Sequence, residues 1–138
     1  MLTGGFKGRS REVPAFELRA AIARAFELPG AAVVGEYGMT ELSSQLYEAT
    51  LVRTHASHEV YTSPPWVRVT AVHPETLAAA AAGEVGIARI VDLANVDSAV
   101  AIQTADRVRV TAEGVELLGR LPGATPRGCS LAVEEVLG

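Results

Sequence analysis

The chain has 138 residues, of which 49% are hydrophobic, enough for one domain with a sizeable core. Sixteen acidic against twelve basic residues give a net charge of −4, and no long basic run is present, which argues against nucleic acid or an anionic membrane surface as the main partner. No apolar run approaches the ~20 residues of a membrane helix. We therefore expect a cytoplasmic protein with small-molecule or protein partners.

The cysteine count excludes two kinds of site. Cys129 is the only cysteine, which excludes an internal disulfide and a cysteine-rich zinc site. Its thiol is either an inert packed group or a reactive one. His55 and His58 lie in a polar stretch without a carboxylate or thiol cluster, so we interpret them as surface-loop residues and not as metal ligands.

The first expected element is a helix that follows the glycine turn Thr3-Gly4-Gly5. It starts near Pro14 and ends before Pro29-Gly30. The expected apolar face carries Leu18, Ile22 and Phe26, and the expected outer face carries Arg19, Arg24 and Glu27.

The next elements predict a strand, a turn and a second helix. The apolar residues 31–34 suit a buried strand, the glycines at 35 and 38 suit a tight turn, and Thr40 suits the N-cap of a helix over residues 41–48. The first fifty residues therefore predict the tail of a parallel α/β layer.

After about residue 50, β-branched residues and short alternations indicate a small antiparallel sheet or barrel. The expected strands cover residues 66–72, 85–91, 107–111 and 115–118, and residues 78–82 are expected to form a helical turn or linker. Residues 131–137 suit either a helix or the start of a strand. We expect three segments: an α/β segment (1–50), a β-rich lobe (51–120) and a hinge-like C-terminal segment (121–138).

The turn between the predicted strand and helix suits a nucleotide phosphate. Free amides at a helix start attract anions, and the Thr40 hydroxyl can donate to a phosphate oxygen. Glu41 beside phosphates makes sense mainly through a bridging cation. The alternative is that Thr40 is only a cap and Glu41 only complements the helix dipole.

The pattern Tyr37-Gly38-Met39-Thr40-Glu41 resembles the signature of the acyl-adenylate-forming ligases, which activate carboxylic acids with ATP. Further stretches resemble motifs of that superfamily in the same order. They are Thr3-Gly4-Gly5, Gly83-Glu84-Val85-Gly86, Ile102-Gln103-Thr104-Ala105-Asp106, Gly119-Arg120 and Arg127-Gly128-Cys129-Ser130-Leu131.

The closer resemblance is to the LuxE-like acyl-protein synthetases, a bioluminescence-related family. It is carried by five stretches: Gly4-Gly5-Phe6-Lys7, the run from Glu36 to Gln45, Asp92-Leu93-Ala94-Asn95, Ile102-Gln103-Thr104 and Arg127-Gly128-Cys129-Ser130-Leu131. The resemblance implies activation of a fatty acid with ATP and its transfer to a cysteine near the C-terminus. Cys129 matches that cysteine, and an acyl-transferring or reductase protein is a possible further partner.

The resemblance also implies a role for each matching residue. The turn at Gly4 and Gly5 and the Tyr37-Gly38 turn would sandwich the adenine of ATP or AMP, and Asp106 would bind the ribose hydroxyls. Thr40 would contact phosphate, Glu41 would ligate Mg2+, and Arg120 would reach ribose or phosphate. The structural alternatives are a core aromatic residue for Tyr37 and a turn residue for Asp106.

The sequence also departs from the pattern of the superfamily. Ala105 replaces the usual glycine, and Leu121-Pro122 stands where an aspartate is common. The glycine-rich triphosphate loop and the lysine-bearing C-terminal domain have no counterpart here, so we expect the C-terminal part of a longer enzyme that works with an N-terminal half or partner subunit. The alternatives are a non-catalytic nucleotide-binding or docking module, an inactive remnant, or part of an acyl-CoA ligase.

Overall fold

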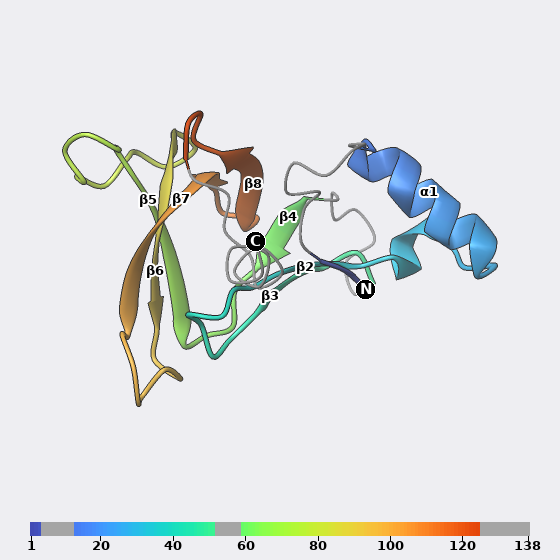
Figure 1. Cartoon of the computed structure of the whole chain (residues 1–138), viewed down its shortest axis with the longest axis horizontal. Coiled ribbons are helices and arrows are strands. Elements are labelled where there is room, and N and C mark those ends of the chain that lie inside the picture. Colours follow the sequence, from blue (N-terminus) through green and yellow to red (C-terminus); the bar gives the residue numbers. More distant parts are fainter. Residues whose placement is uncertain (4–12, 52–58, 125–138) are drawn as a thin grey trace, which may run out of the picture.

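The computed structural model describes residues 1–3, 13–51 and 59–124, and these residues form a single mixed sheet with one α-helix beside it (Figure 1). The helix α1 spans Ala15–Ala25, and a short 3-10 helix η1 spans Gly30–Ala32. The strands are β1 (Leu2–Thr3), β2 (Gly35–Tyr37), β3 (Leu46–Glu48), β4 (Val60–Thr62), β5 (Val67–Val72), β6 (Val85–Asp92), β7 (Ala101–Val110) and β8 (Val115–Arg120).

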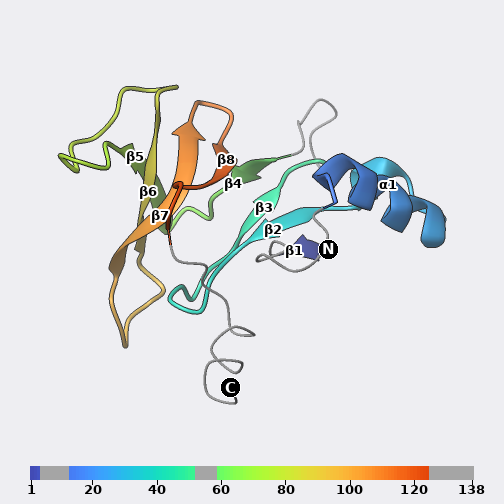
Figure 2. The same ribbon diagram turned by 45° about the horizontal axis from the view of Figure 1, so that its top comes forward.

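The sheet has the strand order β1-β2-β3-β4-β8-β7-β6-β5. β1 and β2 pair in parallel and are joined through α1, as a parallel pair requires, while all the other neighbouring strands are antiparallel. Figures 1 and 2 show α1 at one end of the molecule, β5, β6 and β7 at the other, and β2 and β3 running between them. The predicted α/β class, a parallel unit followed by a β-rich lobe, is confirmed.

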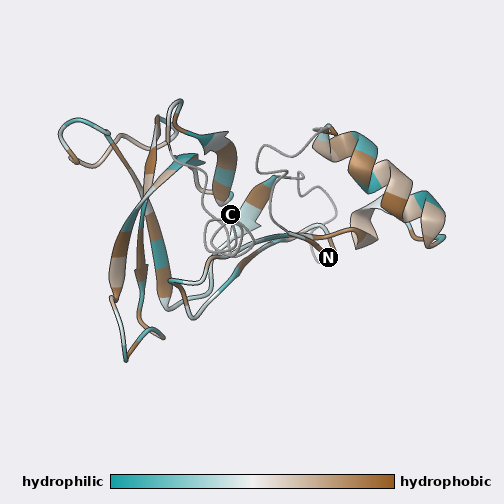
Figure 3. Ribbon diagram, in the orientation of Figure 1, coloured by the Kyte–Doolittle hydropathy of each residue, from teal (hydrophilic) through white to brown (hydrophobic). Residues whose placement is uncertain are grey.

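The core lies on one face of the antiparallel strands. Figure 3 shows both hydrophobic and hydrophilic residues along these strands, and in β5 the buried and more exposed residues alternate from Val67 to Ala71. The buried core cluster consists of Leu42, Leu46, Tyr61, Val67, Val69, Ala71, Ala88, Ile90, Val108 and Val115. Tyr37, the last residue of β2, and Met39, two residues after it, pack against this cluster. The core therefore supports the turn that the sequence singled out.

The first helix is confirmed, but its orientation is not the predicted one. It begins after Pro14, as the fixed backbone angle of proline favours. Phe26, predicted on the buried face, is 71% exposed, whereas Arg19, predicted on the outer face, is 8% exposed. The helix is turned so that a charged side chain faces the sheet, because a buried carboxylate there pairs with it.

That carboxylate belongs to Glu48 on β3. Arg19 Nη1 and Nη2 donate to the two oxygens of Glu48 at 2.9 and 2.5 Å, and Nη1 also donates to the carbonyl of Val33 at 2.7 Å. The backbone N–H groups of Gly35 and Glu59 donate to the same carboxylate at 2.6 and 2.5 Å. One buried ion pair thus joins α1 to β2, β3 and the start of β4.

The prediction for residues 31–48 is wrong in two places. The first two residues of the predicted strand at 31–34 belong to η1, and the strand comes later, at Gly35–Tyr37. The predicted helix over 41–48, with Thr40 as its N-cap, is absent: residues 40–41 form a turn, and β3 follows. Burial alternates through Leu42, Ser44, Leu46 and Glu48, a period of two that belongs to an extended chain.

The predicted strands of the β-rich lobe are confirmed, with β7 beginning at Ala101 and so including the whole segment up to Asp106. The stretch 78–82 is not helical; it forms an isolated bridge from Ala79 to Val72 and a turn at Gly83, whose φ is +80°. The segment boundary predicted near residue 50 stays a prediction, and it falls between the paired strands β3 and β4. In the described ranges, no helix has the length and apolar character needed to cross a membrane.

Candidate functional site

Three of the predicted site residues meet at the junction of β2, β7 and β8. The Tyr37 hydroxyl donates a hydrogen bond to Asp106 Oδ2 at 2.7 Å, across 69 positions of the sequence. Arg120 Nη1 lies 3.4 Å from Asp106 Oδ1. The structure therefore brings an aromatic ring, a carboxylate and a guanidinium together from the three separate motifs that carry the resemblance.

Strand pairing explains why Asp106 and Arg120 meet. They are register partners across β7 and β8, and the register shifts between Asp106 and Val108. Such a bulge turns side chains out of the regular alternation, a common device beside functional sites. The Thr104 hydroxyl accepts a hydrogen bond from the Asp106 N–H at 3.0 Å and so fixes the backbone at this point.

Tyr37 is held between this carboxylate and the core. Its ring packs edge-to-face against Tyr61, with centroids 6.4 Å apart. Burial, and then the charge of Asp106 and the hydrogen bond to it, raise the pKa of Tyr37 well above its ordinary value. The phenol therefore stays protonated at neutral pH and keeps donating to Asp106.

Thr40 and Glu41 lie in the turn that follows Tyr37, at the surface. Both residues are exposed, and Leu42 N donates to the Met39 carbonyl at 3.1 Å to close the turn. Asn95 Nδ2 donates to the Glu41 carbonyl at 2.9 Å from the β6–β7 loop. Thr40 and Glu41 are thus carried by the connection between β2 and β3, directly after Tyr37 at the end of β2.

The metal prediction rests on Glu41 alone. Across the described ranges, no group of three or more histidine, cysteine, aspartate or glutamate side chains is placed to hold a metal ion. A single exposed carboxylate still fits the way Mg2+ binds beside nucleotides, where one or two carboxylates share the ion with phosphate oxygens and water. Glu41 as a magnesium ligand stays a prediction.

Several residues singled out in the sequence fall outside the described ranges: Gly4, Gly5, His55, His58, Arg127 and Cys129. Their predicted roles remain predictions. Gly38 is described: a Cβ there would lie 2.5 Å from Glu36 Oε1, the end of a flexible side chain, and 3.1 Å from Gln45 Cγ, so these side chains would have to shift.

Sequence reasoning gave no role to a buried polar cluster behind the Thr40–Glu41 turn. Asp92, at the end of β6, is fully buried, and its carboxylate accepts hydrogen bonds from the N–H groups of Ser43 and Ser44. An aspartate that ends an apolar strand and is followed by an asparagine is a pattern typical of loop capping, and this signal was available in the sequence.

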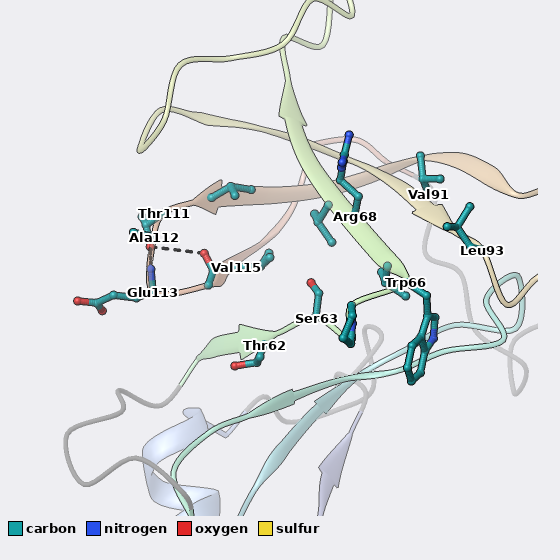
Figure 4. Close-up of a pocket in the computed structure, with 15 residues that line it drawn as sticks. Thr62, Ser63, Trp66, Arg68, Val91, Leu93, Thr111, Ala112, Glu113 and Val115 are labelled. Carbon is teal, nitrogen blue, oxygen red and sulfur yellow. Dashed lines mark hydrogen bonds between the residues drawn. The ribbon is translucent and has the colours of Figure 1, made fainter.

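An open groove lies between β5 and the β7–β8 hairpin (Figure 4). Its volume is about 600 Å³, and its walls include Trp66, Arg68, Leu93 and Glu113. Trp66 precedes β5 directly, lines the groove, and donates from Nε1 to the Ser44 hydroxyl at 2.9 Å.

Comparison with solved structures places this arrangement in a known fold. The chain superposes on MatB from Rhodopseudomonas palustris in its ATP-bound form, with a TM-score of 0.56 and 21% identity over 73% of this chain and 23% of MatB. The apo form of MatB gives a TM-score of 0.52 and 19% identity, over 64% of this chain and 21% of MatB. An ATP-bound chimera of RpMatB and BxBclM, named B3, gives a TM-score of 0.56 and 21% identity, over 73% of this chain and 23% of the chimera.

These matches show the fold alone: the chain is folded like one part of the MatB structures. The chain spans less than a quarter of the length of the structures that it matches. A scan against protein-family models and a search of curated proteins found no match.

Proposed function

We propose that this chain forms the ribose- and phosphate-binding part of an enzyme that activates a carboxylic acid with ATP as an acyl adenylate. The convergence of Tyr37, Asp106 and Arg120 carries the proposal. The fold is shared with structures described as ATP-bound, which supports a nucleotide as the ligand.

The carboxylate of Asp106 has capacity left for a ribose. An ionised carboxylate offers about four acceptor positions, of which the Tyr37 hydroxyl takes one and Arg120 faces another. The Asp106 side chain is 16% exposed, so part of it reaches solvent. Two neighbouring ribose hydroxyls are donors that match this geometry, and Arg120 supplies positive charge toward the phosphates.

The chemical step places two negative charges in contact. A carboxylate oxygen of the acid attacks the α-phosphorus of ATP, the bond to the bridging β-phosphate oxygen breaks, and pyrophosphate leaves. Arg120 and a Mg2+ ion shared by Glu41 and the phosphates would offset this charge. Thr40, in the turn next to Tyr37, would donate its hydroxyl to a phosphate oxygen.

The finer proposal is that the enzyme is a LuxE-like acyl-protein synthetase acting on a fatty acid. The Cys129 thiolate would attack the carbonyl carbon of the acyl adenylate, forming a thioester while AMP leaves and carries the electron pair of the broken carbon–oxygen bond. The support is the motif around Arg127 to Leu131 in the sequence. Incubation with acyl adenylate followed by mass spectrometry tests it: an acyl adduct on Cys129 that is absent in Cys129→Ala is expected.

The main alternative within the same chemistry is an acyl-CoA ligase, which shares the adenylate site and differs in the acceptor. Turnover on coenzyme A without an adduct on Cys129 would favour it. A non-catalytic nucleotide-binding module is the alternative of another class. Such a module binds ATP and AMP but exchanges no pyrophosphate, so pyrophosphate–ATP exchange by this chain joined to the N-terminal half, in the presence of a fatty acid, separates it from part of an enzyme.

A further inference from the structure

The turn that carries Thr40 and Glu41 has no regular secondary structure of its own. Residues 38–45 lie between β2 and β3, and no ladder of backbone hydrogen bonds fixes them. A turn that binds phosphate has to be held in one conformation, because a displacement of about 1 Å at a binding group is costly for catalysis. The polar cluster behind the turn supplies this constraint.

Asp92 holds the far side of the turn through its buried carboxylate. Oδ2 accepts from the N–H groups of Ser43 and Ser44 at 3.1 and 2.9 Å, and Oδ1 accepts from the Ser44 hydroxyl and the Ala94 N–H at 2.9 and 3.0 Å. A buried charge without partners would be strongly unfavourable, and here donors surround it. The carboxylate therefore fixes the backbone two residues after Glu41.

Asn95 holds the near side of the same turn. Its Nδ2 donates to the carbonyls of Glu41 and Ala99 at 2.9 Å each, and its Oδ1 accepts from the Ser43 hydroxyl at 3.0 Å. All the hydrogen-bonding atoms of the amide are thus engaged, and the side chain is 8% exposed. Asn95 bonds directly to the backbone of the residue predicted to bind the metal.

From these contacts we infer that Asp92 and Asn95 are positioning residues of the phosphate-binding half of the nucleotide site, an inference that rests on the proposed function. They act on the Thr40–Glu41 turn, because the side-chain hydrogen bonds of Asp92 and Asn95 given above go to residues 41–44 and to their own loop, and not to Tyr37 or Asp106. Trp66 belongs to the same cluster, because its Nε1 bonds to the Ser44 hydroxyl that Asp92 accepts from. The groove that Trp66 lines is in this way connected to the turn.

The two halves of the site can be tested separately with two ligands. ATP engages both halves, whereas adenosine has no phosphate and engages only the Tyr37–Asp106 half. Asn95→Ala is the first variant, because it frees the Glu41 carbonyl and the Ser43 hydroxyl without burying a new charge. Equilibrium dialysis of ATP and of adenosine against the wild type and the variant gives an affinity for each pair.

We expect Asn95→Ala to lower the affinity for ATP about tenfold and to leave the affinity for adenosine unchanged, since the loss of one or two hydrogen bonds costs about that factor. Trp66→Phe is a second variant that keeps the fold, because Trp66 is half exposed; it should produce a smaller change of the same selectivity. Glu116→Gln on β8 is the control and should change neither affinity.

The outcomes separate this inference from the proposed function. A wild type that binds both ligands, with Asn95→Ala weakening both equally or neither, would overturn the positioning role and leave the function standing. A wild type that binds neither ligand would overturn the proposed function and this inference with it. Selective loss of ATP binding in Asn95→Ala supports both.

Discussion

The guanidinium of Arg19 lies against the carboxylate of Glu48 in a two-pronged ion pair, with Nη1 to Oε2 at 2.9 Å and Nη2 to Oε1 at 2.5 Å. Arg19 is 8% and Glu48 is 4% exposed, so water screens the pair little. The pair fastens α1 to the sheet at the point where β2 begins, and β2 leads directly into the Tyr37 turn. The Arg19–Glu48 ion pair therefore links α1 to the strand that carries Tyr37 of the candidate site.

Glu48→Gln should destabilise the protein by about 3–5 kcal/mol, because it leaves the Arg19 charge buried without its partner. The amide also presents donors where the carboxylate accepted bonds from Gly35 and Glu59. Urea unfolding at neutral pH measures the change. The exposed Glu75→Gln is the matched control, and an equal change in both variants would contradict the account.

The same carboxylate predicts an acid-sensitive stability. Burial alone would raise the pKa of Glu48, but the N–H groups of Glu59 and Gly35 and the Arg19 guanidinium outweigh it and lower the pKa below its ordinary 4.5. A depressed folded pKa contributes stability above pH 4.5 and loses it as the pH falls through the folded value. Glu48→Gln should remove this part of the acid dependence of the unfolding free energy; an unaltered slope would contradict it.

Ionisation of Tyr61 should lower the stability of the protein at alkaline pH. Burial, and then the charge of Glu48, raise the pKa of Tyr61 to about 12. A raised folded pKa contributes stability that is complete below the unfolded value of about 10 and is lost as the pH rises through the folded one. A tyrosinate absorbance titration should contain a step near pH 12 that Tyr61→Phe removes. Titrations of the two proteins that superimpose would disprove this.

Gly86 should tolerate no side chain. A Cβ at this position of β6 would lie 2.6 Å from the carbonyl oxygen and 2.8 Å from the nitrogen of Val72, so the backbone of β5 would have to move. Gly86→Ala should cost about 1–3 kcal/mol in unfolding free energy. Gly30→Ala, where a Cβ would meet nothing within 4 Å, is the control and should stay near the wild type. Thermal unfolding of the two variants compares them directly.

The sequence predicts well the parts of the fold that are set by local features, such as a regular spacing of apolar residues or a proline. β5, in which buried Val67, Val69 and Ala71 alternate with more exposed residues, lies where it was expected, and so do β6 and β8. The start of α1 is set by Pro14, whose fixed backbone angle needs no tertiary information. The meeting of Tyr37 and Asp106 followed from the resemblance between motifs, because no local pattern predicts a contact across 69 positions.

The failures have a common physical cause. In residues 41–48, Leu42 and Leu46 are four apart and suit a helix, but they also sit on one face of an extended chain. The choice is made by Asp92, which draws the N–H groups of Ser43 and Ser44 away from a helical pattern. Arg19 was placed outward for a similar reason: its partner Glu48 lies on another element, beyond the reach of any local pattern.

The affinity of the protein for ATP, measured for the wild type, Asp106→Asn and the control Asp97→Asn, tests the central claim most directly. Asp97 is an exposed carboxylate of the β6–β7 loop, so its variant changes the net charge equally without touching the site. The account predicts binding by the wild type, a loss of about tenfold or more in Asp106→Asn, and no change in Asp97→Asn. Undiminished ATP binding by Asp106→Asn would contradict it.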